Sequence, residues 1–360
     1  MKNVQLKEAL KSIPLLNPVM LASKEGKFYV SSHTSVYAVM SIFDVADIPP
    51  FNAVLSPEAA KNLSKLVSGV KEADVHMEVK DKNLHVASGR KKAVFTLMKD
   101  KTTIDAALKV RDETFSPNVS MRVEDLSDAM QAVSHYSGDK SIADVRFHGY
   151  HMYVGKDKIE FMSSNNKGMS IAECSTSSNM EPFITLVPKE FQSLIRGSRG
   201  DISLQIENGK RIVGRINTST HEVRFISTLV NSTPLPYRGI LPDSTQVLNT
   251  IRVSKKELQD AFAEGDFFSP DDKYCRVRFN VALDSINIKS ANPENGSIEV
   301  DVPASADKEE AFDISYGTLA QLLGNSTNDI LIIEVYSKRV VIKTGSMNIL
   351  AKFDVDNASQ

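Results

Sequence analysis

The 360-residue sequence contains no tryptophan and only two cysteines. Cys174 and Cys275 stand far apart, each within a strand-like stretch. Two cysteines can build neither a disulfide framework nor, by themselves, a metal site. We therefore expect both to be half-buried apolar side chains in a reducing compartment.

Targeting signals are missing as well. No apolar run approaches the length needed to cross a bilayer. The N-terminal stretch MKNVQLKEALKSIPLL has no apolar segment followed by a small-residue cleavage site. These absences predict a cytoplasmic protein without membrane contact.

Motifs for enzyme chemistry are also lacking. The sequence contains no Walker phosphate loop, no G-x-S-x-G elbow, no H-E-x-x-H pair and no C-x-x-C. His148 and His151 lie close together in strand-like sequence without a third candidate ligand, so a surface or cross-strand pair is favoured over a metal site. We expect no catalytic residues, no metal and no cofactor.

Neither sign of charge dominates the composition. The 43 Lys and Arg residues stand against 45 Asp and Glu residues, which gives a formal net charge of −2. A total says nothing about how charge is distributed, so it does not exclude a nucleic-acid partner.

A unit of helix, polar turn, Asp and alternating strand occurs three times in the sequence. The copies lie at residues 55–79, 186–206 and 314–335. The Asp that opens the strand falls at Asp74, Asp201 and Asp329, at intervals of 127 and 128 residues. Nearly equal intervals between divergent segments indicate a triplicated module.

Hydrophobic periodicity predicts two half-units of helix plus antiparallel strands in each module. Helices are expected at 4–13, from Ser56, at 123–133 and at 254–263, and the expected strands include 18–22, 27–31, 35–43, 75–79, 83–87, 92–97 and 145–148. Pro and polar residues interrupt the pattern near Ser116–Pro117 and at 242–245. The prediction is an α+β fold of three domains, at residues 1–117, 118–243 and 244–360.

Cations recur on the faces opposite the apolar stripes of the repeated helices. They are Lys7, Lys11, Lys61, Lys65, Lys189, Arg196, Lys255 and Lys256. Like charges at i, i+4 spacing weaken a helix, so their repetition indicates a polyanion whose phosphates they contact without reading bases. For any single helix, a solvated face remains the alternative, which acidic neighbours such as Glu58 and Asp128 favour.

Collinear segments carry a resemblance to a known family. PLPYRGILP at 234–242 is followed by a strand and by the helix start VSKKEL at 253–258. The others, in order, are VASGRKK (86–92), DVRF (144–147), FISTLV (225–230), SANPE (290–294) and FDISY (312–316). In order and spacing, over essentially the whole chain, they resemble the bacterial sliding clamps, the beta subunit of DNA polymerase III.

The resemblance implies three clamp domains in each of two head-to-tail subunits, which form a ring with helices lining the hole and sheets outside. Double-stranded DNA would pass through the hole against the basic helix faces, and the polymerase and clamp loader would bind through a short peptide motif. The implied function is a processivity factor and not an enzyme. A clamp-like scaffold that does not encircle DNA is the alternative, and an enzyme with an unrecognised site is a distant third.

The resemblance also implies a peptide pocket between the second and third domains. Its residues would be Arg146, His148, Gly168, Met169, Ile171, Gly239, Ile240, Leu241, Ile349, Ala351 and Phe353. Many of them are apolar, as an anchor pocket needs.

Two departures from the family concern this pocket. The sequence has NKGMSI at 166–171 where the family has TDGHRL, and AKFDV from Ala351 leads into a tail where the family ends near MPMRL. These differences bear on peptide specificity, and they suggest a virus-encoded or otherwise unusual source.

For the contact between subunits, the resemblance implies that an edge strand of domain 1 pairs with one of domain 3 around a small apolar cluster. The residues would be Ala93 and Phe95 against Phe267 and Phe268. Adjacent phenylalanines in a polar loop are typical of such a contact, with burial in their own domain as the alternative.

Overall fold

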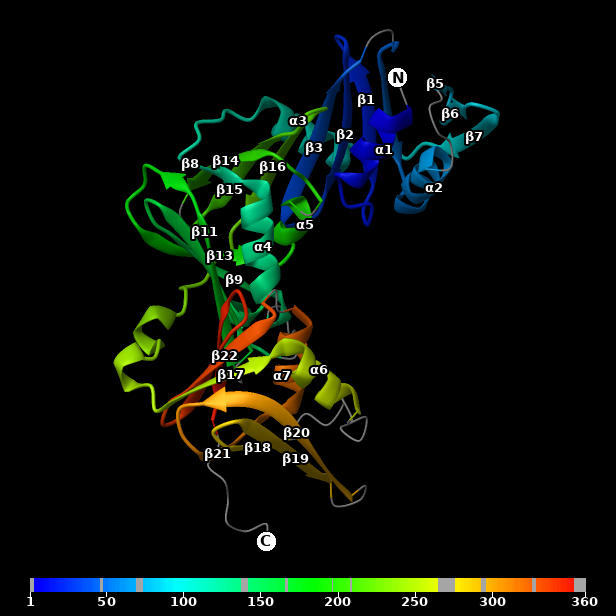
Figure 1. Cartoon of the computed structure of the whole chain (residues 1–360). Helices are drawn as coiled ribbons and strands as arrows, with labels where there is room; N and C mark the ends of the chain where they lie inside the picture. Colours follow the sequence, from blue (N-terminus) through cyan, green and yellow to red (C-terminus); the bar gives the residue numbers. More distant parts are fainter. Residues whose placement is uncertain are drawn as a thin grey trace. The chain divides into compact units, whose positions relative to one another are not determined.

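The computed structural model describes the chain except at residues 1–2, 46–47, 69–73, 137–141, 166–167, 196, 208, 265–275, 293–295, 326–327 and 353–360. Contacts divide the chain into two compact units (Figure 1). Unit 1 comprises Met1–Ser127, Tyr153–Ile159 and Cys174–Thr233, and unit 2 comprises Asp128–Met152, Glu160–Glu173 and Pro234–Gln360. The three-domain division at residues 117 and 243 stays a prediction.

One antiparallel sheet forms the centre of unit 1. Its strands are, in spatial order, β12 (Ser177–Ser178), β8 (Val119–Arg122), β14 (Asp201–Glu207), β15 (Arg211–Asn217), β16 (Glu222–Thr228), β3 (Tyr37–Asp44), β2 (Lys27–His33), β1 (Val19–Lys24) and β4 (Phe51–Leu55). β16 pairs with β3, with Phe225 opposite Val39. Strands from two of the predicted modules therefore share one hydrogen-bonded sheet, which leaves neither module with an open edge at this position.

Two helices pack against each other in unit 1, α1 (Asn3–Lys11) and α2 (Pro57–Ser68). α2 begins after Ser56, whose Oγ accepts a hydrogen bond from the Ala59 N–H at 3.2 Å. Its apolar stripe buries Ala60, Leu63 and Val67, and full burial of a side chain such as Leu63 contributes roughly 1.5–3 kcal/mol. The helices predicted at 4–13 and from Ser56 are confirmed.

A separate three-stranded sheet follows α2, formed by β5 (Val75–Lys80), β6 (Asn83–Ser88) and β7 (Lys91–Thr96). Unit 1 also contains β13 (Phe183–Pro188) and the short helix α5 (Phe191–Ile195) of the central repeat copy. Helix α4 (Val123–Val133) spans the division between the two units.

Helix α3 (Lys101–Asp112) was not predicted from the sequence. Asp100 caps it, because the carboxylate accepts a hydrogen bond from the Thr103 N–H at 3.2 Å. The helix buries Thr103, Ala107 and Val110 against the central sheet, where it contacts β1, β2, β3 and β16. The signal was present in the sequence as an Asp followed by apolar residues at helical spacing.

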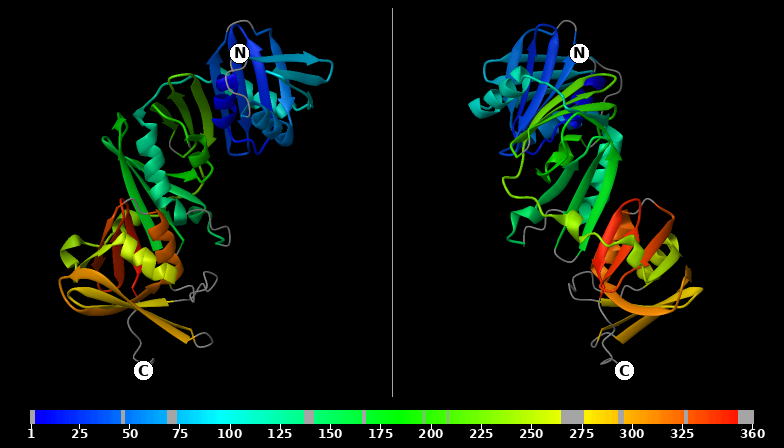
Figure 2. Two further views of the ribbon diagram at one scale, coloured as in Figure 1. Left: turned by 45° about the vertical axis from the view of Figure 1, so that its right-hand side comes forward. Right: turned by 90° about the vertical axis from the view of Figure 1, so that its left-hand side faces the viewer.

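Unit 2 is built on a second antiparallel sheet. Its strands run in the order β13, β9 (Gly149–Val154), β10 (Lys158–Ser164), β11 (Gly168–Ser175), β24 (Met347–Ala351), β23 (Arg339–Lys343), β22 (Ile330–Val335), β17 (Asn249–Ser254), β20 (Gly296–Ala306), β19 (Ser285–Asn292), β18 (Arg276–Val281) and β21 (Glu310–Ser315). Helices α6 (Lys255–Glu264) and α7 (Tyr316–Asn325) lie side by side (Figure 2). Their buried leucines, such as Leu258 and Leu319, belong to the core of this unit.

One expected strand is wrong. Residues 145–148 begin with the 3₁₀ turn η2 (Val145–Phe147) instead of a strand. Asp144 causes the difference, because its side chain accepts a hydrogen bond from the Arg146 N–H at 3.0 Å and so closes a turn.

Cys174 is buried and is not part of a disulfide, and Cys275 lies outside the described residues. Within the described part of the chain, no helix combines the length and apolar character needed to cross a membrane.

Candidate functional sites

The predicted pocket residues on β11 and β24 are brought together by strand pairing within unit 2. Met169 lies opposite Ile349, and Gly168 lies opposite Leu350. Met169 and Ile171 are 9% and 8% exposed, and Ile349 is 4% exposed. These three side chains therefore form the buried floor of this region, while most of the polar and small residues of the predicted set are more exposed.

Gly168 lies where no side chain fits. A Cβ on this residue would lie 2.9 Å from the Tyr136 hydroxyl oxygen and 3.0 Å from the Ile349 carbonyl oxygen. Tyr136 is fully buried, and burial raises the pKa of its hydroxyl above the ordinary value. The glycine thus allows β11 to approach a rigid aromatic side chain that the sequence-based prediction missed.

The junction predicted to contribute Gly239, Ile240 and Leu241 contains the 3₁₀ turn η3 (Tyr237–Ile240). Two side chains of this turn hold it against β10. The Tyr237 hydroxyl donates to the Glu160 carboxylate at 2.7 Å, and the Arg238 guanidinium donates to both oxygens of the same carboxylate at 3.1 Å.

Glu160 is almost fully buried, so its charge requires these partners. Burial, and then the hydrogen bond to Glu160, raise the pKa of Tyr237 above its ordinary value. The tyrosine consequently stays a donor across the physiological pH range.

His151 connects the η2 turn to the segment that leads into the junction. Its Nδ1 accepts a hydrogen bond from the Leu235 N–H at 3.2 Å, and its Nε2–H donates to the Arg146 carbonyl at 3.1 Å. An imidazole can accept and donate at once only when it is neutral. Burial lowers the pKa of His151 to about 4, which keeps this form at neutral pH.

The prediction of a surface or cross-strand pair for His148 and His151 is wrong for His151, which is buried and bonded to backbone groups at both nitrogens. His148 is half-buried, with its Nε2 2.7 Å from the Ile142 carbonyl oxygen. In the parts of the chain that the structure describes, no group of His, Cys, Asp and Glu side chains is arranged to hold a metal ion.

Arg146 has its charge neutralised locally. Its Nε donates to Asp144 Oδ2 at 2.8 Å, and this contact lowers the pKa of Asp144 to about 2. A peptide carboxylate at this position would have to compete with Asp144. Phe353 lies outside the described residues.

The predicted DNA-facing cations fall on or beside helices in both units. In unit 1, Lys11, Lys61 and Lys65 are exposed on the adjacent helices α1 and α2, with Lys7 half-exposed. Lys189 precedes α5 in the turn, and Lys255 and Lys256 open α6. Arg196 lies outside the described residues.

Helix α4 differs from this pattern. Its first turn contains Glu124 and Asp125, its last turn contains no cation, and Asp128 is exposed on its surface. The first turn of α4 is therefore acidic, unlike the exposed lysines of α1 and α2.

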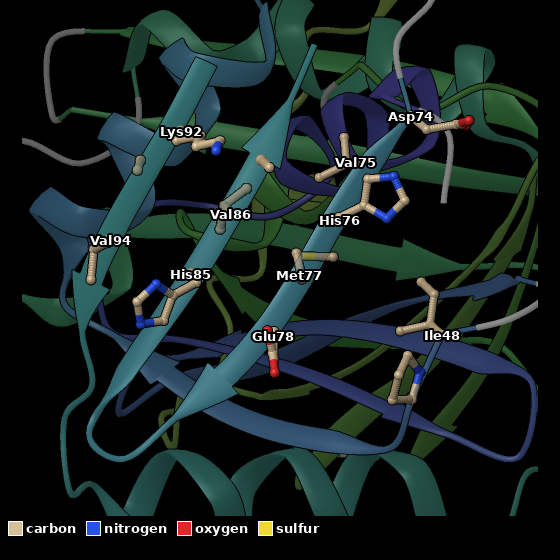
Figure 3. Close-up of a pocket in the computed structure, with 13 residues that line it drawn as sticks. Ile48, Asp74, Val75, His76, Met77, Glu78, His85, Val86, Lys92 and Val94 are labelled. Carbon is tan, nitrogen blue, oxygen red and sulfur yellow. The ribbon is translucent and has the colours of Figure 1, made fainter. Parts of the chain in front are cut away.

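The predicted subunit contact involves β7, an edge of the three-stranded sheet. Ala93 and Phe95 alternate with exposed Lys92 and Val94, and they are only half-buried. Ala93 also lines an open cavity of about 860 Å³ on this sheet, and Figure 3 shows Val94 on β7 beside His85 on β6. Phe267 and Phe268 lie outside the described residues.

No protein-family model matches this sequence, and no curated protein matches it. Solved structures match it over its whole length. The DNA polymerase sliding clamp of Pseudomonas aeruginosa is 14% identical, with a TM-score of 0.80 and 99% of each chain covered. The DNA polymerase III beta subunit of Thermotoga maritima is 15% identical, with a TM-score of 0.81, and 99% of this chain and 98% of that chain are covered.

This chain has the sliding-clamp fold. The predicted α+β architecture of repeated clamp modules is thereby confirmed, although sequence identity is low. Both of these structural neighbours are bacterial, and nothing in the comparison supports a virus-encoded source.

We expect Gly168→Ala to reduce the free energy of unfolding by about 1–3 kcal/mol, because the added methyl group overpacks the Tyr136 hydroxyl. Gly239→Ala is the matched control, since nothing lies within 4 Å of its Cβ position. Urea denaturation of both variants measures the difference. Equal stabilities would contradict the close approach at Gly168.

We expect stability to fall as the pH drops from about 6.5 toward 4, because the unfolded chain takes up a proton at His151 that the folded chain does not. The slope from one such group is at most about 1.4 kcal/mol per pH unit. His151→Gln should be less sensitive to pH than the wild type in urea denaturation at pH 7.5 and 5. His135, whose pKa burial lowers to about 4, and His221, whose pKa burial also lowers, should contribute to the remaining dependence. An unchanged pH dependence in the variant would exclude His151 as a neutral bridge.

Proposed function

We propose that the protein is a DNA sliding clamp, a non-enzymatic processivity factor of the cytoplasm that encircles double-stranded DNA as a homodimeric ring. The observation that carries this proposal is the match of the whole chain, 99% on both sides, to a DNA polymerase sliding clamp. A match to one module alone would support only a shared domain. The match of complete chains supports a shared assembly.

The cations on α1, α2 and α6 supply the contacts to DNA in this proposal. Lysines on helix surfaces contact phosphates through charge and carry no sequence information. Contacts of this kind are weak and exchange rapidly, so the ring slides while its closure prevents dissociation.

A polymerase and a clamp loader would bind through a short peptide at the pocket of unit 2. Buried Met169, Ile171 and Ile349 provide its floor, and the η3 turn provides a wall held by Glu160. Preorganised walls reduce the ordering cost of peptide binding. The Asp144–Arg146 pair of the η2 turn favours a peptide that meets this turn with neutral or apolar groups.

A clamp-like scaffold that binds replication or repair proteins without encircling DNA is the second candidate. The acidic start of α4 favours it, because a scaffold needs no continuous basic channel.

Topology distinguishes these two functions. The protein assembled on nicked circular plasmid DNA should remain bound during gel filtration and should be lost after the circle is cut with a restriction enzyme. The mass in solution at micromolar concentration should be that of a dimer. Equal retention on circular and linear DNA, or a strictly monomeric mass, would favour the scaffold.

The lysines of α1 and α2 can be tested by the salt dependence of DNA binding. Lys61→Gln with Lys65→Gln should reduce the slope of log K against log salt by about 0.9 for each phosphate that the variant no longer neutralises. Lys210→Gln is the control, because Lys210 is exposed in the turn between β14 and β15. The same slope in all three proteins would remove these residues from the DNA-binding surface.

The peptide pocket can be tested with Ile240→Asp in η3. An acidic side chain in an apolar anchor site should weaken binding of a polymerase-derived clamp-binding peptide by about tenfold or more, as fluorescence anisotropy would measure. Leu248→Asp is the control, since Leu248 is 47% exposed and lies outside the predicted pocket. Unchanged affinity of the Ile240→Asp variant would contradict the assignment.

A further inference from the structure

Unit 1 contains a cavity of about 410 Å³ beneath α3, on the face of the central sheet that this helix covers. Strand pairing defines its floor. Ala22 of β1 lies between Asn52 of β4 and Tyr29 of β2, so the three side chains form one row on one face. Met20 is two residues from Ala22 and points to the same face.

The roof of the cavity is the side of α3 that contains Ile104, Ala107 and Leu108. These positions are one helical turn apart, so they face the same surface. Ala107 is buried where α3 packs on the sheet, and its small side chain, together with that of Ala22, leaves space between the helix and the sheet. Leu108 is 39% exposed and lies at the rim of the opening.

The walls are almost entirely apolar, with Met20, Tyr29, Met40, Phe51, Ile104 and Leu108 as the large side chains. Methionine adapts its shape to an occupant because it has three rotatable bonds and a polarisable sulfur. The volume lies within the range of small-molecule sites. At roughly 30 Å³ for each water-sized group, the cavity accommodates about a dozen such groups.

The charged residues that line the cavity are both cations, Lys24 at the end of β1 and Arg111 in the last turn of α3. Each of the two cations forms an ion pair with the residue that follows it in the sequence, and that residue does not line the cavity. Lys24 Nζ lies 3.2 Å from Glu25 Oε1, and Arg111 Nε lies 2.7 Å from Asp112 Oδ1. The Lys24–Glu25 pair is exposed and therefore weak. The Arg111 guanidinium donates a second hydrogen bond to Asp112, from Nη2 to Oδ2 at 2.9 Å, so a bound carboxylate has to displace the largely exposed Asp112 from Arg111.

We propose that this cavity binds a small amphipathic carboxylic acid, of the kind represented by a medium-chain fatty acid. The hydrocarbon tail occupies the apolar space between α3 and the sheet. The carboxylate lies at the mouth and accepts hydrogen bonds from Arg111 and Lys24. The cations supply orientation, because a neutral apolar molecule of the same length would fill the space without engaging them. This site is separate from the DNA and peptide surfaces proposed above.

Titration calorimetry of the full chain with decanoate, and with decanol as the uncharged probe, tests the proposal. We expect saturable one-site binding of decanoate about tenfold tighter than that of decanol. Arg111→Gln should remove most of this preference without abolishing decanol binding. Lys109→Gln, which changes an exposed cation on the same helix outside the lining, should bind as the wild type does.

Leu108→Trp tests the cavity itself, because a larger side chain at the rim fills it. Binding of both probes should be lost while circular dichroism and thermal unfolding show a folded protein. Binding of decanoate that survives Leu108→Trp in a folded variant would overturn the proposal. Equal affinities for decanoate and decanol, or binding of peptides with an apolar C-terminal residue but not of decanoate, would also overturn it.

Discussion

The neutral imidazole of His151 is the interaction on which the candidate peptide site depends. It accepts the N–H of Leu235 and donates to the carbonyl of Arg146, so one buried side chain fixes the spacing of two backbone segments. Glu160 fixes the η3 turn in a similar way, because Tyr237 and Arg238 both donate hydrogen bonds to its carboxylate. Shape in this region is thus set by buried polar groups with few alternative partners, which favours one arrangement of the walls.

Periodicity and repeat spacing predicted much of the fold because they report directly on burial. The apolar stripe that contains Leu63 and Val67 can be recognised from the local sequence of α2 alone. Helix α3 was missed because the predicted half-unit, one helix followed by strands, leaves no place for a second helix after the strands. The turn at Val145 was misassigned because Asp144 outweighs the strand propensity of the following residues by closing a local hydrogen bond.

The candidate site was less accessible to sequence reasoning. The family resemblance assigned Met169 and Ile349 to one site, and the two residues lie opposite each other on paired strands. Their role in binding a peptide stays a prediction. The groups that hold it were not predicted, because His151, Glu160 and Tyr136 act through contacts between residues distant in sequence. A histidine in strand-like sequence gives no sign of whether both ring nitrogens find backbone partners. Whether they do depends on how strands and turns pack together in the folded chain.

Both arginine and lysine form partly buried ion pairs in this chain, as Lys352 does with Glu310. The buried or half-buried ion pairs include Arg238 with Glu160 and Arg278 with Asp313, where a planar guanidinium can meet a carboxylate in fixed geometry. In contrast, the structure describes no ion pair for Lys11, Lys61 or Lys65, which are exposed on α1 and α2. An ammonium group is strongly hydrated and acts as a point charge, so it attracts phosphate without holding one geometry. Such cations suit a surface along which a polyanion moves, and they explain how a chain with a net charge of −2 can still present a basic face.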